Sequence, residues 1–108
     1  MARIGRLRHK DDVLAVIRHG KKARTPYALI YIQPSKNLRM ACVVGKKVSR
    51  LAVQRHRIQR QLREILREVA PSFSTPVDIV AVALPPAKTV ESYTILKQAI
   101  ISAVSKLQ

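Results

Sequence analysis

Acidic side chains are scarce in this sequence of 108 residues, which has 6 Asp and Glu against 21 Lys and Arg and a formal net charge of +15. Aromatic residues are few as well, with no Trp, 1 Phe and 3 Tyr. The single cysteine, Cys42, excludes an internal disulfide and a cysteine-rich zinc site, and it is typical of a reducing compartment. We therefore predict a cytoplasmic protein.

Long apolar runs are also missing. The longest, residues 79–84, is far shorter than the roughly 20 residues that span a bilayer. The N-terminal segment, residues 1–8, is charged but lacks the apolar region of a secretory signal. Hydrophobic residues still make up 47% of the chain, which is enough for one core. We expect residues 1–108 to form a single domain with no membrane partner.

The positive charge is concentrated in the first two thirds of the chain. Residues 1–70 carry 18 basic and 4 acidic side chains, whereas residues 71–108 carry 3 and 2. Such a field in a small domain favours a polyanionic partner, and nucleic acid is the usual one inside cells. The composition thus predicts a single RNA- or DNA-binding domain.

Periodicity and turn residues predict an α+β fold. We expect a short helix over residues 11–19 with Gly20 as its C′ residue, followed by strands at 27–32 and 40–44. The turn-forming residues 34–37 indicate that these two strands form a hairpin. A long helix over 49–69, an apolar strand over 77–84 buried on both faces, and a last helix capped by Ser92 complete the pattern. One apolar stripe marks this last helix: Tyr93, Leu96, Ile100, Val104 and Leu107.

The long helix carries the strongest functional signal because its apolar and basic residues fall on separate faces. The expected core face consists of Leu51, Ile58, Leu62, Ile65, Leu66 and Val69. The opposite face gathers His56, Arg57, Arg60, Arg63 and Arg67. Arg55 is the exception, since the same wheel places it beside the apolar face near the helix start. Arginine binds phosphate through a two-pronged guanidinium, so we interpret the basic face as a nucleic-acid contact rather than an ordinary solvated face, in which charges of both signs mix.

Catalysis by the protein itself is a weaker interpretation. A metal-dependent nuclease needs several carboxylates around its cations, and the one local pair, Asp11 and Asp12, is already explained as acids in the first turn of a helix. The histidines at positions 9, 19 and 56 are the candidates for acid–base chemistry without a metal. We predict no catalytic and no metal-binding residue. A ribosomal or other structural RNA-binding protein remains the alternative that composition does not separate.

The segment from Lys46 to Glu64 resembles the signature of the bacterial ribonuclease P protein component. The matching positions are Lys46, Lys47, Ala52, Arg55, Arg57, Ile58, Arg60, Arg63 and Glu64. Two positions depart from the usual pattern, with His56 in place of Asn and Gln59 in place of Lys. Further matches extend the resemblance over nearly the whole chain: Arg6, Leu7, Asp12, Val16, Gly20 and the strand at 77–84 followed by Pro85.

The resemblance implies the protein subunit of an endoribonuclease that removes the 5′ leader from precursor tRNA. In that family the RNA subunit carries the chemistry with bound magnesium, so the implied protein is a monomer in the ribonucleoprotein, binds no cofactor itself, and has ribonuclease P RNA and precursor tRNA as partners. The implied RNA-binding residues, with Arg67 added from the basic face, are Lys46, Lys47, Arg50, Arg55, His56, Arg57, Arg60, Arg63 and Arg67.

The resemblance also implies a fold and a second site. The family order is α-β-β-β-α-β-α with a left-handed crossover, a ribosomal-protein-S5-domain-2-like arrangement of helices on a small mixed sheet, which requires an extra strand near residues 21–25. The leader-binding cleft falls on Val13, Ile17 and Tyr31, where Val13 and Ile17 replace aromatic residues. For Tyr31 two readings stand side by side, an exposed ring that stacks on a leader base and a ring packed in the core.

Overall fold

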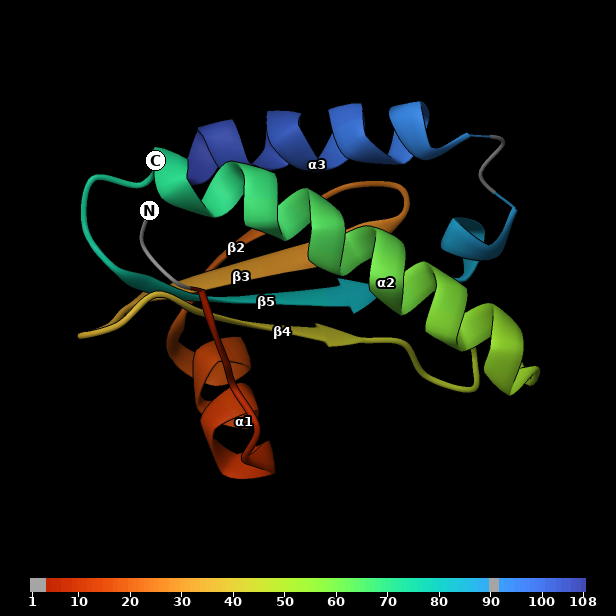
Figure 1. The fold of residues 1–108 in the computed structure, drawn as a ribbon, viewed down its shortest axis with the longest axis horizontal. Helices are drawn as coiled ribbons and strands as arrows, with labels where there is room; N and C mark the ends of the chain where they lie inside the picture. Colours follow the sequence, from red (N-terminus) through yellow and green to blue (C-terminus); the bar gives the residue numbers. More distant parts are fainter. Residues whose placement is uncertain (1–3, 90–91) are drawn as a thin grey trace.

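The computed structural model describes residues 4–89 and 92–108, so the first three residues of the charged N-terminal segment lie outside the description. Three helices and a five-stranded sheet make up the fold (Figure 1). The strands are β1 (Gly5–Arg6), β2 (Lys21–Arg24), β3 (Ala28–Pro34), β4 (Arg39–Val43) and β5 (Val77–Ala83). The helices are α1 (Lys10–His19), α2 (Ala52–Val69) and α3 (Tyr93–Leu107), with short 3₁₀ turns η1 (Ala70–Ser72) and η2 (Pro85–Lys88). The expected α+β order is confirmed, including the extra strand β2. In addition, the two-residue strand β1 precedes helix α1.

The predicted hairpin between the strands at 27–32 and 40–44 is wrong. The strand order in the sheet is β1-β4-β5-β3-β2, so β5 lies between β3 and β4. It pairs antiparallel with β3 and parallel with β4. The hairpin of this fold is one strand earlier, between β2 and β3, where the Thr25 hydroxyl accepts hydrogen bonds from the Tyr27 and Ala28 N–H groups.

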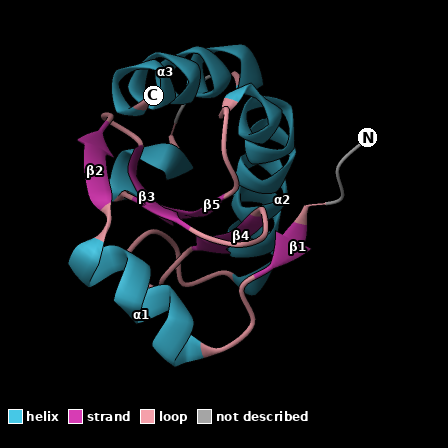
Figure 2. Cartoon of the chain, turned by 90° about the vertical axis from the view of Figure 1, so that its left-hand side faces the viewer, coloured by secondary structure: helices cyan, strands magenta, loops and turns pink. Residues whose placement is uncertain are grey.

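The connection from β4 through α2 to β5 is left-handed, as Figures 1 and 2 show together. In Figure 2 both strands run away from the viewer, α2 lies above the sheet, and β5 lies to the left of β4. Nearly all such crossovers are right-handed. The hand implied by the family resemblance is therefore the observed one, against the general rule.

The sheet is covered on both faces. Helices α2 and α3 lie on one face and α1 lies on the other (Figure 2). This arrangement explains the apolar pattern of β5, in which every residue is buried except the partly exposed Val82. The larger core, between the sheet and α2 and α3, includes Ile30, Ile79 and Leu96. A smaller core lies under α1.

Two helix ends differ from expectation and one agrees. Gly20 has an extended backbone (φ −75°, ψ 162°) rather than the left-handed conformation common at C′. Helix α2 begins at Ala52, and Leu51, which we expected in the core, is 68% exposed because it lies outside the helix as its N-cap residue. Ser92 caps α3 as predicted, with its hydroxyl accepting a hydrogen bond from the Ile95 N–H. Within the described ranges, no helix has the length and apolar character needed to cross a bilayer.

Candidate nucleic-acid interface

Helix α2 is held to the sheet by its apolar face, which leaves its basic face outward. Five of the six expected core residues are buried: Ile58, Leu62, Ile65, Leu66 and Val69. The basic residues gather on the outer surface of the helix and on the loop before it. Those that are exposed are Lys46, Lys47, Arg50, His56, Arg57, Arg60 and Arg67. Packing thus presents most of the sequence-predicted RNA-binding residues on one continuous segment.

Arg55 is half-buried and turns back toward the loop that precedes α2. Its Nη1 donates hydrogen bonds to the carbonyl oxygens of Ser49 (3.1 Å) and Arg50 (3.0 Å). Ser49 in turn bonds the start of the helix, since its hydroxyl donates to Gln54 Oε1 (2.6 Å) and accepts from the Leu51 N–H (3.2 Å). Arg55 therefore shapes the turn from which Arg50 extends, and this role accounts for its place beside the apolar face.

Gln59, one of the two departures from the family pattern, also has a structural contact. Its Nε2 donates a hydrogen bond to the Cys42 carbonyl oxygen (2.9 Å), which ties the middle of α2 to β4. The Cys42 side chain lies in the same region, and burial raises its pKa from 9.0 to about 12, against the opposing charges of Arg63 and Arg6. The thiol is thus a neutral packing group at neutral pH.

No carboxylate of the described residues forms an ion pair with the basic face. Among residues 4–89 and 92–108 the ion pairs are Arg39–Asp78 (2.9 Å) and Lys97–Glu68 (2.6 Å). The first joins β4 to β5 and the second joins α3 to α2, so neither involves an arginine of α2. An array of exposed arginines without protein partners is suited to binding phosphate groups.

The second expected site lies on the other face of the sheet. Tyr31 is 8% exposed and packs with Leu7, Val16 and Val80. Its ring is therefore packed in the core rather than exposed. Val13 and Ile17 are partly buried on the sheet-facing side of α1. Further partly buried apolar residues line the same face beside them, namely Leu29, Ala41 and Val82. The result is an apolar surface beside α1 whose partly open side chains are aliphatic.

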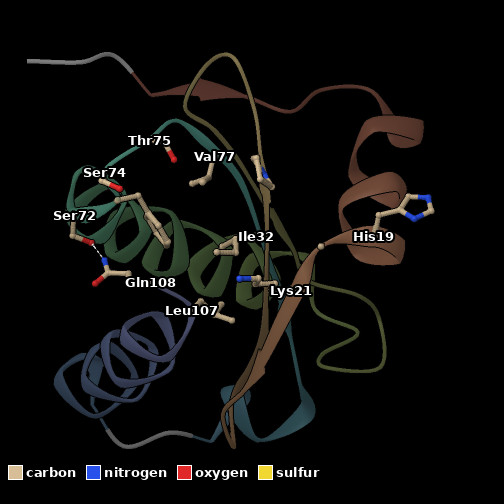
Figure 3. Close-up of a pocket in the computed structure, with 12 residues that line it drawn as sticks. His19, Lys21, Ile32, Ser72, Ser74, Thr75, Val77, Leu107 and Gln108 are labelled. Atoms are coloured by element: carbon tan, nitrogen blue, oxygen red, sulfur yellow. Dashed lines mark hydrogen bonds between the residues drawn. The ribbon is translucent and has the colours of Figure 1, made fainter.

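A separate cavity lies away from both of these surfaces, as Figure 3 shows. It has a volume of about 440 Å³ and lies between β2, β3, the segment from η1 to β5, and the end of α3. Ile32, Val77 and Leu107 supply apolar walls, and Ser72 at its rim is hydrogen-bonded to Gln108. None of the predicted RNA-binding or cleft residues lines this cavity.

The positions of the acidic residues and histidines decide whether the described part of the chain could carry out catalysis itself. In the described part of the chain no group of three or more His, Cys, Asp or Glu side chains is arranged to hold a metal ion. His9 precedes the first residue of α1 and His19 is its last, which separates them by roughly 15 Å along the helix axis. His56 is on α2, on the opposite face of the sheet. The three histidines therefore do not form one acid–base site.

Comparisons with known proteins agree on one family. The ribonuclease P family model matches residues 1–108. The ribonuclease P protein component of Pseudanabaena sp. (strain PCC 6903) is 38% identical over 78 residues, which cover 69% of this chain and 67% of that protein. The fold is similar to that of the Staphylococcus aureus RNase P protein (TM-score 0.80, 22% identity, 94% of this chain and 93% of that one). It is equally similar to the RNase P protein from Thermotoga maritima (TM-score 0.81, 20% identity, 95% and 97%).

Proposed function

Because the chain belongs to the ribonuclease P protein family, we propose that its arginine face binds the RNA subunit of ribonuclease P and that the surface beside α1 holds the 5′ leader of precursor tRNA. The protein is a component of an endoribonuclease that processes tRNA. Residues 1–108 act as one RNA-binding domain, as a monomer within the cytoplasmic ribonucleoprotein.

The observation that carries the RNA-subunit contact is the exposed, unneutralised arginine array of α2. Arg57, Arg60 and Arg67 are exposed along the helix, and no ion pair of the described residues involves them. Lys46, Lys47 and Arg50 extend the array into the turn that Arg55 shapes. A rigid helix with several guanidinium groups on one side matches the regular phosphate spacing of a folded RNA backbone.

The leader contact rests on the apolar surface beside α1. Single-stranded RNA exposes base faces, which pack on apolar and aromatic side chains. Here Val13 and Ile17 face the sheet beside Leu29 and Val82, so the contact would be made by aliphatic groups. Tyr31 supports this surface from the core under α1 rather than serving as an open stacking platform.

The chemistry of leader removal belongs to the RNA subunit in this proposal. The protein offers neither a metal-binding carboxylate cluster nor converging histidines among its described residues. Magnesium would be bound by the RNA, and the protein would lower the magnesium requirement by neutralising phosphate charge. Membership of the family also removes the support for the alternative of a ribosomal protein.

The first test is cleavage of the 5′ leader of a precursor tRNA by a bacterial ribonuclease P RNA at low magnesium, with and without this protein. We expect strong stimulation that requires the RNA subunit. Tight RNA binding without stimulation would favour a structural RNA-binding protein, and cleavage by the protein alone would contradict the assignment of the chemistry to RNA.

The second test addresses the leader surface through Val43, which follows Ala41 by two residues on β4, pairs with Val82 and is 38% exposed. Val43→Asp places a negative charge where the leader would lie. We expect the reconstituted holoenzyme to lose about tenfold affinity for precursor tRNA and none for tRNA without a leader. Ile101→Asp, at a 39% exposed position of α3 on the other face of the sheet, is the matched control. Equal losses for both tRNAs would remove this surface from leader binding.

A further inference from the structure

A second, smaller pocket opens at the edge of the sheet where β1 pairs with β4, beside α2. Its volume is about 270 Å³, and arginine side chains from two distant parts of the sequence line it. Arg6 and Arg8 come from β1 and the residues after it, and Arg63 comes from α2. Gln59 and Cys42 are also part of its wall, and no Asp or Glu is. The pocket therefore concentrates three positive charges without a protein counter-ion on its wall.

The backbone around this pocket is fixed on both sides. On the β1 side, the Gly5 N–H donates to the Leu38 carbonyl (2.8 Å) and the Leu7 N–H donates to the Met40 carbonyl (3.0 Å). On the α2 side, Gln59 Nε2 donates to the Cys42 carbonyl (2.9 Å), one turn before Arg63. Arg6 and Arg63 thus extend from backbones that are both anchored to β4.

Arg6 and Arg63 both line the wall of this pocket. The charges of Arg63 and Arg6 both act to lower the pKa of the Cys42 thiol, although burial outweighs them and raises it. Both side chains line the same pocket as Cys42, so the α2 and β1 cations lie in one region of the surface. Two like charges held together in this way repel each other unless an anion lies between them.

We propose that this pocket binds one phosphodiester group of an RNA backbone, with Arg6 and Arg63 on either side and Arg8 as a third cation. The two guanidinium groups donate N–H hydrogen bonds, which phosphate oxygens accept. The pocket volume leaves room for a phosphodiester group. This inference rests on the proposed function in taking RNA as the source of the phosphate.

The position of the pocket explains why an RNA strand would reach it. Arg63 belongs to the same helix as the exposed arginine face, while Leu7, also in the pocket wall, packs with Val16 and Tyr31 under α1. The pocket therefore lies at the sheet edge between the two proposed RNA surfaces. A phosphate fixed there would hold a strand that passes from the α2 face toward the surface beside α1.

The first experiment uses inorganic phosphate and the free protein, so it does not depend on any RNA. We expect the side-chain amide signals of Gln59 in ¹H–¹⁵N spectra to shift saturably with phosphate. The apparent affinity should fall at least fivefold in Arg6→Ala and should be unchanged in Arg18→Ala, which removes the same charge from the exposed side of α1. Arg6→Lys, which keeps the charge but not the fork, should be intermediate. Gln59 signals that do not move, or that move equally in Arg6→Ala, would overturn the proposal.

The second experiment measures binding to ribonuclease P RNA as a function of salt for wild type, Arg6→Ala, Arg63→Ala and the double variant. If both arginines hold one phosphate, the double variant should lose about one unit of the log–log salt slope. Loss of about two units, with additive effects on affinity, would mean two independent phosphates and overturn the shared site. A wild-type protein that shows the Gln59 response but does not bind this RNA would instead contradict the proposed function.

Discussion

Gly20 shows how a residue can be predicted correctly for the wrong reason. The sequence pattern placed it after the last turn of α1, where glycine often adopts a left-handed backbone. Its actual backbone is extended, and what requires glycine is space, because an added Cβ would lie 2.5 Å from both the Val16 and the Ile32 carbonyl oxygens. A one-dimensional pattern contains the neighbour at Val16 but not the contact with β3.

Replacing Gly20 with Ala should therefore destabilise the protein. The new methyl group must displace backbone atoms of α1 or β3, which typically costs about 1 to 3 kcal/mol. Gly45→Ala is the control, since nothing lies within 4 Å of its would-be Cβ. Urea denaturation should give a lower midpoint for Gly20→Ala and a midpoint close to wild type for Gly45→Ala. A loss of equal size in both variants would show that close packing is not the reason for Gly20.

Cys42 predicts a dependence of stability on alkaline pH. Burial raises the pKa of its thiol from 9.0 to about 12 in the folded protein. Below pH 9 the thiol is protonated in the folded and unfolded states alike, so this stabilising contribution is fully present. Above pH 9 only the unfolded thiol loses its proton, and the contribution is lost as pH rises toward 12.

The matched variant is Cys42→Ala, which has no group to titrate at this position. Relative to this variant, wild type should lose about 2 kcal/mol of unfolding free energy between pH 8 and about pH 10.5. Denaturation curves of both proteins at these two pH values measure the difference. A constant gap between them would mean that the thiol titrates alike in both states.

At the scale of elements, local pattern predicted what each segment becomes but not which segments meet. The alternation and β-forming residues of β3 and β4 predict two strands, and the turn residues between them favour a hairpin. Nothing within those residues indicates that β5, which follows β4 by 34 residues, inserts between them. The correct topology, with its left-handed crossover, came from a resemblance to a family rather than from the general rules for connections.

The same limit applies to the candidate site. The period of α2 separated its buried and basic faces, because that separation is a property of one helix. It could not place Leu51, which is exposed where the helix has not yet begun, or Tyr31, whose burial depends on α1 and β5. Nor could the helix period predict the pocket lined by Arg6 and Arg63, since these residues are 57 positions apart in the sequence.

Two arginines of α2, five residues apart, should have different roles, one in stability and the other in RNA contact. Arg55→Ala removes hydrogen bonds to two backbone carbonyls and should lower the unfolding free energy by about 1 to 3 kcal/mol. Arg60→Ala removes an exposed side chain and should change it by less than about 0.5 kcal/mol.

Binding to ribonuclease P RNA completes this comparison. Arg60→Ala should reduce the salt slope by about one unit, which is the signature of one lost phosphate contact. Arg55→Ala should weaken binding mainly by disordering the turn that carries Arg50, with a smaller change of slope. Unfolding curves and salt titrations on both variants measure the two effects, and an unchanged slope in Arg60→Ala would remove Arg60 from the interface.

For the whole molecule, the central position of β5 determines how the fold holds together. It is hydrogen-bonded to β3 on one side and β4 on the other, and helices cover both of its faces. Strand β5 comes late in the sequence, so the sheet cannot close until residues that are far apart in the chain come together. By contrast, β1 has two residues and pairs only with β4.

Native-state hydrogen exchange should reveal this hierarchy. The amides of Ile79 and Ala81 in β5 should exchange only through global unfolding, so that their opening free energy equals the unfolding free energy. The amide of Gly5 should open locally at much lower free energy, because both residues of β1 are exposed and the strand pairs with β4 alone. The β2–β3 hairpin serves as the internal comparison, since it is a local pairing with an exposed edge. If its amides outlasted those of β5, the hairpin rather than the long-range pairing would be the most stable unit of the fold.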